Sequence, residues 1–467
     1  MRGLGVALLV CCAEGLTGPA RARGAAQKPP LRACAAPPPE PRPSGARLVV
    51  GASLALGLVN GGAIFGWPGL RGLLESRGVA LSAGEWARMY TVGTVAFSGS
   101  APIAGNVLDR FGPRAASALA GALCALAFVG LALCTRARGL TLAYAALSVG
   151  GFCGYLASIS LGNSEPSRFH APPLAPAERA RMVTRLSCLV DVSAITFVAL
   201  HAAQRRLGGA VQPRTILIAL ALATAALHTA IWRGWTRVYV AAPGACARGG
   251  SAPTGAAKQA APRLSTQLRS SSFAIILLFA TVHSLSSGHA LAHLPARVGE
   301  TRAAGRGGRA ALAELASLLM TAGCLPAIPL VSACLDKGLG RAMTSVNVLG
   351  LAYVALSLAP GAPARLCSAV VFAAYRGLLY STINLFHAWV FGPAVMGRTI
   401  GAMSLLSSFP LFALQLPIFG GGPHFARAQR ALACAFVVLS AATELYVRRE
   451  HRRDRMGAAG GAASAAA

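Results

Sequence analysis

The stretch GNVLDRFGPR, residues 105–114, gathers charge in a chain that carries little of it. Asp109, Arg110 and Arg114 lie within six residues, although charged residues make up only 12% of the sequence. An aspartate here can accept hydrogen bonds from the amides of a helix N-terminus and can pair with an arginine. Two glycines would allow a close helix approach and a tight turn, and these are Gly105 and Gly112. The pattern predicts a hinge between two helices.

Two further ionisable residues lie inside long apolar stretches. Asp191 belongs to LVDVSAITF (189–197), and Arg376 belongs to VVFAAYRGLLYS (370–381). A charged side chain is costly in hydrocarbon, so both residues should face a bundle interior or water. Arg376 could bind a carboxylate and Asp191 an ammonium group, or each could pair with neighbouring polar groups to fix helix packing. The polar companions of Arg376 are Tyr375, Ser381 and Asn384.

Flexible or polar positions in other apolar stretches are candidates for a solute site. Non-helical backbone at membrane depth is tolerated where it lines a wet cavity, and Asn60, Gly61 and Gly62 could form such a segment. The same glycines could equally serve close helix packing. Tyr155 is either a cavity residue or part of a tight helix contact.

Histidines and serines cluster in a fourth apolar stretch. His283, Ser284, Ser287 and His289 could line a cavity or relay protons. A lone histidine inside a membrane more often serves packing, with its ring nitrogens bonded to neighbours. His283 and Ser287 are our candidates for a solute site in this stretch, and the sequence leaves uniport, exchange and proton coupling open.

The elements that hold these residues follow from hydropathy. Hydrophobic residues make up 55% of the 467-residue chain, and its mean hydropathy is +0.57. A membrane-spanning helix needs about 20 mainly apolar residues. The sequence predicts an all-α integral membrane protein with twelve spans, near 48–68, 89–108, 115–134, 140–161, 185–203, 215–232, 271–292, 311–334, 342–360, 364–388, 399–419 and 430–447.

The net charge of +29 has a membrane explanation. Lysine and arginine hold cytosolic loops in place, and they are more frequent in the loops and tails that a cytosolic N-terminus would assign to the inside. We therefore predict that both termini are cytosolic. Because no basic patch is interleaved with aromatic residues, nucleic acid is not an expected partner.

Cysteine spacing and catalytic motifs argue against several function classes. Most of the twelve cysteines lie in predicted spans, and none has metal-ligand spacing. There is no HExxH, GxSxG or nucleotide-binding loop in the sequence. We predict no disulfide, metal or cofactor, and no enzyme activity.

The longest hydrophilic segment between spans, 233–270, divides the chain. It carries six basic residues, no acidic ones, and much Gly, Ala, Ser and Pro, which is linker composition. It separates six-helix bundles at 48–232 and 271–447. The flanking segments are predicted tails, 1–47 and 448–467. The first of these is Pro-rich and basic, and we expect it to be disordered, although MRGLGVALLVCCAEGL also permits a signal or transit peptide.

The opening motif has an echo in the second half. LDRFGPR follows the second span, and LDKGLGR (335–341) follows the eighth, which is the second span of its half. Asp336, Lys337 and Arg341 would thus repeat the roles of the first motif. Two parallel six-helix repeats are a common transporter architecture.

GNVLDRFGPR matches the loop signature G-x-x-x-D-R-x-G-x-[RK] of the major facilitator superfamily, and the chain resembles that superfamily. The resemblance implies two six-helix bundles that rock about a central site. It also implies that this loop latches the cytosolic ends of the bundles in the outward-open state. The signature indicates the fold and does not identify the solute.

Three shorter motifs resemble one branch of the superfamily. IFGW (64–67), DVSA (191–194) and YRGLLYS (375–381) are similar to motifs of the large neutral amino acid transporters and the related apicomplexan amino acid transporters. This resemblance implies a sodium-independent facilitator or exchanger of neutral, aromatic or cationic amino acids. We expect a monomer in a lipid bilayer, with the plasma membrane as the default. The alternative is another small solute, such as a sugar, a monocarboxylate or an organic anion held by Arg376.

Overall fold

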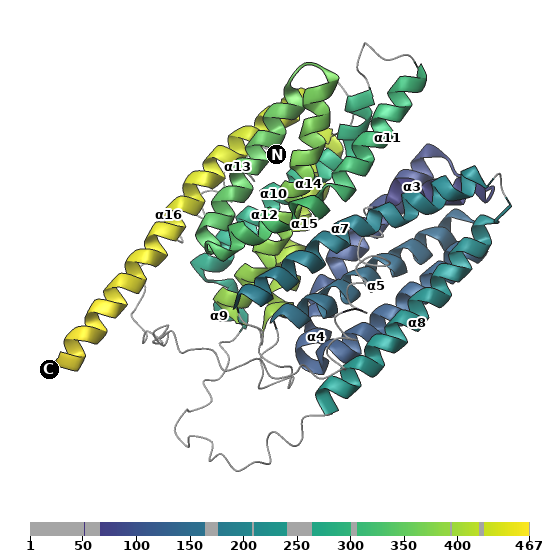
Figure 1. The fold of residues 1–467 in the computed structure, drawn as a ribbon. Coiled ribbons are helices and arrows are strands. Elements are labelled where there is room, and N and C mark those ends of the chain that lie inside the picture. Colours follow the sequence, from purple (N-terminus) through teal and green to yellow (C-terminus); the bar gives the residue numbers. More distant parts are fainter. Residues whose placement is uncertain are drawn as a thin grey trace.

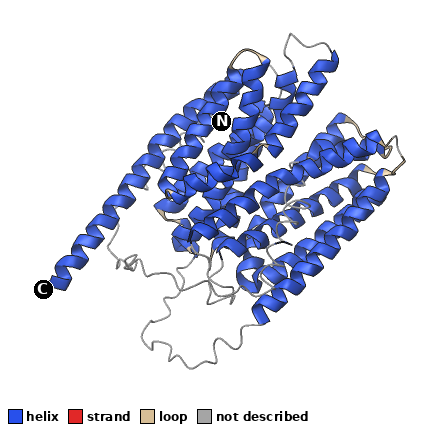
Figure 2. Cartoon of the chain, viewed as in Figure 1, coloured by secondary structure: helices blue, strands red, loops and turns tan. Residues whose placement is uncertain are grey.

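In a computed structural model of the protein, the described part of the chain consists of helices joined by short turns and loops (Figure 2). The described residues are 51, 66–163, 176–207, 210–240, 264–299, 306–392, 395–419 and 425–466. The tail 1–47 and the predicted segment Asn60-Gly61-Gly62 lie outside them.

The helices form two consecutive groups on either side of residues 241–263 (Figure 1). The first group, in purple to teal, is α3 (Trp67–Ser76), α4 (Ala83–Leu133), α5 (Ala137–Asn163), α7 (Pro176–Arg206) and α8 (Pro213–Val240). The second group, in green to yellow, is α9 (Leu264–Leu268), α10 (Ser271–Gly299), α11 (Arg306–Ala322), α12 (Cys324–Asp336), α13 (Leu339–Leu358), α14 (Ala362–Phe386), the π-helix η1 (His387–Phe391), α15 (Met396–Phe419) and α16 (Phe425–Ala466).

Each predicted span from the second to the twelfth coincides with these helices, and the third and ninth run past a helix end by one and two residues. The second and third spans are the two arms of α4, which bends at Gly112, where φ is +80° and ψ is 174°. A side chain rarely adopts that backbone conformation, so glycine makes the sharp bend possible. The eighth span is divided between α11 and α12, which meet at Gly323. Hydropathy therefore located these helices, and among the described residues nine helices are long and apolar enough to cross a membrane.

Regular structure extends further than the predicted bundle boundaries. Residues 233–240, assigned to the linker, continue α8, and residues 448–466, assigned to a tail, continue α16. Part of the remaining linker sequence, 264–268, forms α9. Hydropathy marks where an apolar run ends, but a helix can continue beyond it. In α16 the extension is rich in alanine and arginine, which are strong helix formers.

Each half packs around its own apolar core. The core of the first half includes Leu70, Phe128 and Tyr144, and that of the second half is larger and includes Phe279 and Phe436. A third cluster joins the halves. We call the end of the molecule where α8 ends and α9 begins the linker end, which lies toward the bottom of Figure 1.

The third cluster lies where α4 crosses α15. Ala101, Ala104 and Leu108 of α4 pack there against Met396 and Ile400 of α15. Because small side chains predominate on the α4 side, the two helices can come close together. This crossing places the GNVLDRFGPR motif against the second half.

Candidate functional site

Glycine determines how closely α4 and α15 approach. A Cβ atom on Gly105 would lie 2.0 Å from the carbonyl oxygen of Gly397, and one on Gly397 would lie 2.6 Å from the carbonyl oxygen of Gly105. One turn further along, a Cβ atom on Gly401 would lie 2.5 Å from the carbonyl oxygen of Ala101. The two backbones are therefore in direct contact, which any side chain at these positions would prevent.

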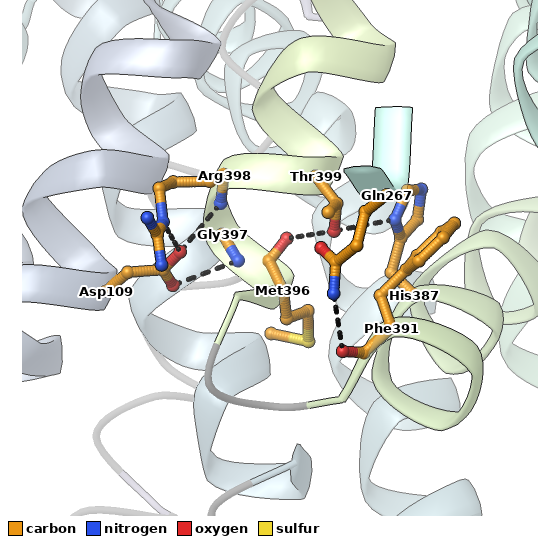
Figure 3. Close-up of polar contacts among 8 residues, drawn as sticks. All are labelled: Asp109, Gln267, His387, Phe391, Met396, Gly397, Arg398 and Thr399. Atoms are coloured by element: carbon orange, nitrogen blue, oxygen red, sulfur yellow. Dashed lines mark hydrogen bonds and ion pairs between the residues drawn. The ribbon is translucent and has the colours of Figure 1, made fainter. Parts of the chain in front are cut away.

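Asp109 bonds across this crossing to the first turn of α15 (Figure 3). Its Oδ1 accepts a hydrogen bond from the amide of Gly397 at 3.1 Å. Its Oδ2 accepts from the amide and from Nε of Arg398, at 2.9 Å and 3.1 Å. The carboxylate side chain is only 4% exposed. It thus satisfies two orphan amides and sits at the positive end of a helix dipole. We call Asp109, Gly397 and Arg398 the latch.

The rest of the motif supports the latch from the first half. The guanidinium carbon of Arg114 lies 4.4 Å from the ring centroid of Trp232 in α8, while Arg110 is exposed. The repeat motif behaves differently. Asp336, Lys337 and Arg341 are exposed around the α12–α13 turn, and within the described part of the chain no hydrogen bond joins them to the first half. Of the two predicted motifs, the structure therefore places the first, GNVLDRFGPR, in contact with the opposite half.

Replacing Gly105 by leucine is expected to open the latch. The new side chain would push α4 from α15, and Asp109 could no longer reach both amides. Overpacking of this kind costs about 1–3 kcal/mol. Under the rocking mechanism that the sequence resemblance implies, this is enough to slow the cycle roughly tenfold. The initial rate of solute uptake into proteoliposomes would measure this effect.

Gly99→Leu is the matched control, because it adds the same side chain to the same helix. A Cβ atom on Gly99 meets nothing within 4 Å. Equal uptake rates for the two variants would contradict the role assigned to the α4–α15 contact.

The turn that leads into α15 is held from two further directions. Nε2 of Gln267 in α9 donates to the carbonyl oxygen of Phe391 at 3.3 Å, and Nδ1 of His387 lies 3.0 Å from the hydroxyl of Thr399 (Figure 3). Sequence reasoning missed these residues and the Gly397-Arg398 half of the latch. The only sequence feature that could have indicated the Gly397-Arg398 pair is its place between two apolar runs.

A cavity of about 160 Å³ lies between the two halves. Its walls come from α4, α5 and α7 of the first half and from α10, α14 and α15 of the second. Eleven of the lining residues carry a hydroxyl group and eight are apolar, so hydroxyl groups are set among apolar surface in a wall without formal charge. Among the described residues, none of the cavity-lining side chains is acidic or basic.

The hydroxyl groups form stripes at helical spacing. Ser404, Ser407 and Ser408 line the cavity from α15, and Ser284 and Ser287 line it from α10. Residues three and four apart lie on one face of a helix, so each stripe turns one face toward the cavity. Phe97 and Phe152 supply an apolar patch, with ring centroids 4.8 Å apart.

No protein-family model matches the sequence, and no curated protein matches it. Solved structures do resemble it. The human organic anion transporter MFSD10 shares 15% identity with a TM-score of 0.58, over 86% of this chain and 100% of that one. A bacterial homologue of the iron transporter ferroportin, in the outward-facing state, shares 15% identity with a TM-score of 0.58, over 86% and 99%. The transporter FucP, in the outward conformation, shares 13% identity with a TM-score of 0.56, over 86% and 98%.

The chain has the major facilitator fold. This confirms the predicted fold class, an all-α membrane protein built from two helical bundles. At these identities the likeness concerns the arrangement of helices, and the cavity must supply the argument about solutes.

Three of the predicted solute-site residues line the cavity of this fold. They are Tyr155, Ser287 and Asn384. The amide nitrogen of Asn384 donates to the hydroxyl of Tyr155 at 2.7 Å and to that of Ser187 at 3.3 Å. The sequence analysis missed Ser187, which nothing in its local sequence distinguishes from other helical serines.

His283 and Tyr375 lie inside the second half, away from the cavity wall. Both are 0% exposed. Nδ1 of His283 lies 2.7 Å from the Tyr375 hydroxyl, and its Nε2 lies 2.9 Å from Oδ1 of Asn347. Since an amide oxygen only accepts, Nε2 carries the hydrogen and Tyr375 donates to Nδ1. These bonds connect α10 with α13 and α14, which is a packing role.

Arg376 is also buried, at 1% exposure, and does not line the cavity. Its guanidinium carbon lies 5.5 Å from the ring centroid of Tyr380, and Tyr380 does line the cavity. Ser381 donates to the carbonyl oxygen of Gly377 within its own helix. Asp191 belongs to α7, but its side chain lies outside the described part of the structure.

Proposed function

We propose that the protein is a secondary transporter that moves a small solute across a membrane by alternating access. The observation that supports this most directly is the cavity between two halves that are latched together at one end. A solute held there contacts both halves, and rocking the halves about it would expose the cavity to each side in turn. The latch closes the linker end, which we propose is the cytosolic end because of the basic loops there.

We further propose that the solute is an amino acid, either large neutral, aromatic or cationic. The cavity combines hydroxyl stripes with an apolar patch, which suits a solute that has a polar head and an apolar body. Its 160 Å³ is close to the roughly 150 Å³ of a cavity that holds one benzene molecule, so in this state it has room for a group of about the size of an aromatic side chain. The resemblance of IFGW, DVSA and YRGLLYS to amino acid transporters points the same way.

Three hydroxyl groups are arranged to accept hydrogen bonds from the solute. Thr94 donates to the carbonyl oxygen of Tyr90, Ser407 to that of Ser404, and Ser408 to that of Leu405. Each hydroxyl hydrogen is thus used within its own helix, which leaves oxygen lone pairs for a donor in the cavity. An ammonium group is such a donor.

An organic anion is the second candidate solute. The guanidinium carbon of Arg376 lies 5.5 Å from the ring centroid of Tyr380, which lines the cavity, and the described lining residues include no acid. A buried positive charge at this place attracts any carboxylate in the cavity, because the surroundings screen it poorly. This attraction would favour binding of an amino acid, through its carboxylate, and of an organic anion.

Uptake by the purified protein in proteoliposomes tests these proposals. Labelled leucine, phenylalanine and arginine would be compared with glucose, lactate and citrate, with and without sodium or a proton gradient. We expect an amino acid to accumulate severalfold above protein-free vesicles without sodium. Accumulation of lactate or citrate alone would favour the anion candidate. If no solute accumulates above the control, the transport proposal itself fails.

A further inference from the structure

One amide at the cavity wall joins helices of the two halves. Asn384 of α14 is 2% exposed, and its Nδ2 donates to the hydroxyl of Tyr155 on α5 and to the hydroxyl of Ser187 on α7. The first bond is short, at 2.7 Å, and the second is longer, at 3.3 Å. We call Asn384, Tyr155 and Ser187 the tie.

The tie and the latch are separate connections. The latch joins α4 to α15 at the linker end, while the tie joins α14 to α5 and α7. All three residues of the tie line the cavity, and none of the three latch residues does. A solute in the cavity can therefore contact the tie directly, whereas it does not reach the described latch residues.

Both N–H groups of the Asn384 side chain already donate hydrogen bonds. An asparagine side chain carries two N–H hydrogens, and both are directed across the interface to the first half. A solute carboxylate or hydroxyl that enters this part of the cavity can accept one of them. Exchanging one hydrogen bond for another costs little overall, so the solute replaces a bond between the halves with a bond to itself.

We propose that the tie is the solute-responsive connection between the halves. It holds the linker end of the cavity closed while the cavity lacks solute, and an acceptor group of the solute releases it. Asn384 is then a positioning residue that converts occupancy of the cavity into separation of the halves. This inference rests on the proposed transport function and concerns how the same site is regulated.

The distance between the two halves at the linker end tests the proposal without any transport measurement. Spin labels would be attached through a genetically encoded keto amino acid at Phe111 and Lys337, which are exposed turn residues of the first and second half. Pulsed electron resonance then gives the populations of short and long distances. This labelling chemistry leaves the native cysteines in place.

In the absence of solute, Tyr155→Phe is expected to raise the ratio of long to short distances about threefold to tenfold, which is the effect of losing one hydrogen bond. Asn384→Ala removes both bonds of the tie and should raise the ratio at least as much. The double variant should shift no further than Asn384→Ala, because both changes remove the same bond. Ser187→Ala should give a smaller shift in the same direction. Ser158→Ala is the matched control, since this α5 hydroxyl donates to Gly154 within its own helix.

Unchanged populations in both Asn384→Ala and Tyr155→Phe would overturn the tie, and so would additive shifts in the double variant. The same distances are then measured after addition of leucine, lactate or glucose. At least one should raise the long-distance population of the wild type and have little effect on the tie variants. If none of the three moves the wild type, solute-dependent release is wrong. A response to lactate or glucose alone keeps the tie and contradicts the amino acid proposal.

Discussion

Replacing Asp109 by asparagine is expected to reduce transport by at least tenfold. The substitution keeps the size of the side chain but removes the charge that accepts three hydrogen bonds from Gly397 and Arg398. The new amide NH₂ group would face an N–H donor of α15, where an acceptor is needed. Hydrogen bonds to a charged group contribute about 1.5–3 kcal/mol each, so we expect a loss of roughly 2–3 kcal/mol from the latched state.

A loss of that size changes the latched to unlatched ratio by roughly 30- to 150-fold. The protein would accumulate with its linker end open and return slowly to the latched state, which every cycle requires under the proposed mechanism. Initial uptake rates in proteoliposomes measure this loss. The spin-label pair at Phe111 and Lys337 should show the matching rise in long distances.

Glu444→Gln is the control for charge removal alone. Glu444 pairs with Arg448 within α16 at 2.8 Å, and both side chains are well exposed, so this pair contributes little. We expect wild-type transport from this variant. An Asp109→Asn protein that is monodisperse and transports like Glu444→Gln would show that the latch has no part in the cycle.

The acidic half of the latch could be predicted from the sequence, but its partner could not. Asp109 stands in a charged motif beside glycines that suit a close crossing. Gly397 and Arg398 are nearly 300 positions away and belong to an ordinary helix start. Their amides function as partners only because α15 begins at the crossing with α4. That position results from tertiary packing, which no local pattern encodes.

The candidate solute site shows the same limit in a different form. Polar residues stand out in apolar helices, so the sequence identified α14 as important. It did not show which way α14 is rotated. Tyr380 and Asn384 share the face that lines the cavity, while Tyr375 points into the core of the second half. Buried hydrogen bonding, as between Tyr375 and His283, produces polar residues that resemble a binding site in the sequence alone.

Ser404→Trp is expected to abolish transport while the protein stays folded. Ser404 lines a cavity of about 160 Å³ between the halves, so the indole has room there and need not enter the core of either half. It would occupy the space that the solute needs, and we expect uptake to fall below about a tenth of the wild-type rate, since overpacking of a site costs about 1–3 kcal/mol. Uptake rate and thermal unfolding would be measured on the same preparation.

Phe409→Trp provides the matched control on the same helix. Phe409 is 62% exposed on α15 and does not line the cavity, so an indole there lies outside the cavity and should leave uptake unchanged. Ser404→Ala, which removes only one of several hydroxyl groups, should retain most of the transport. If Ser404→Trp transports like Phe409→Trp, the solute does not pass through this cavity. In that case the hydroxyl stripes of α10 and α15 would serve helix packing, and the proposals about solute class and the tie would lose their basis.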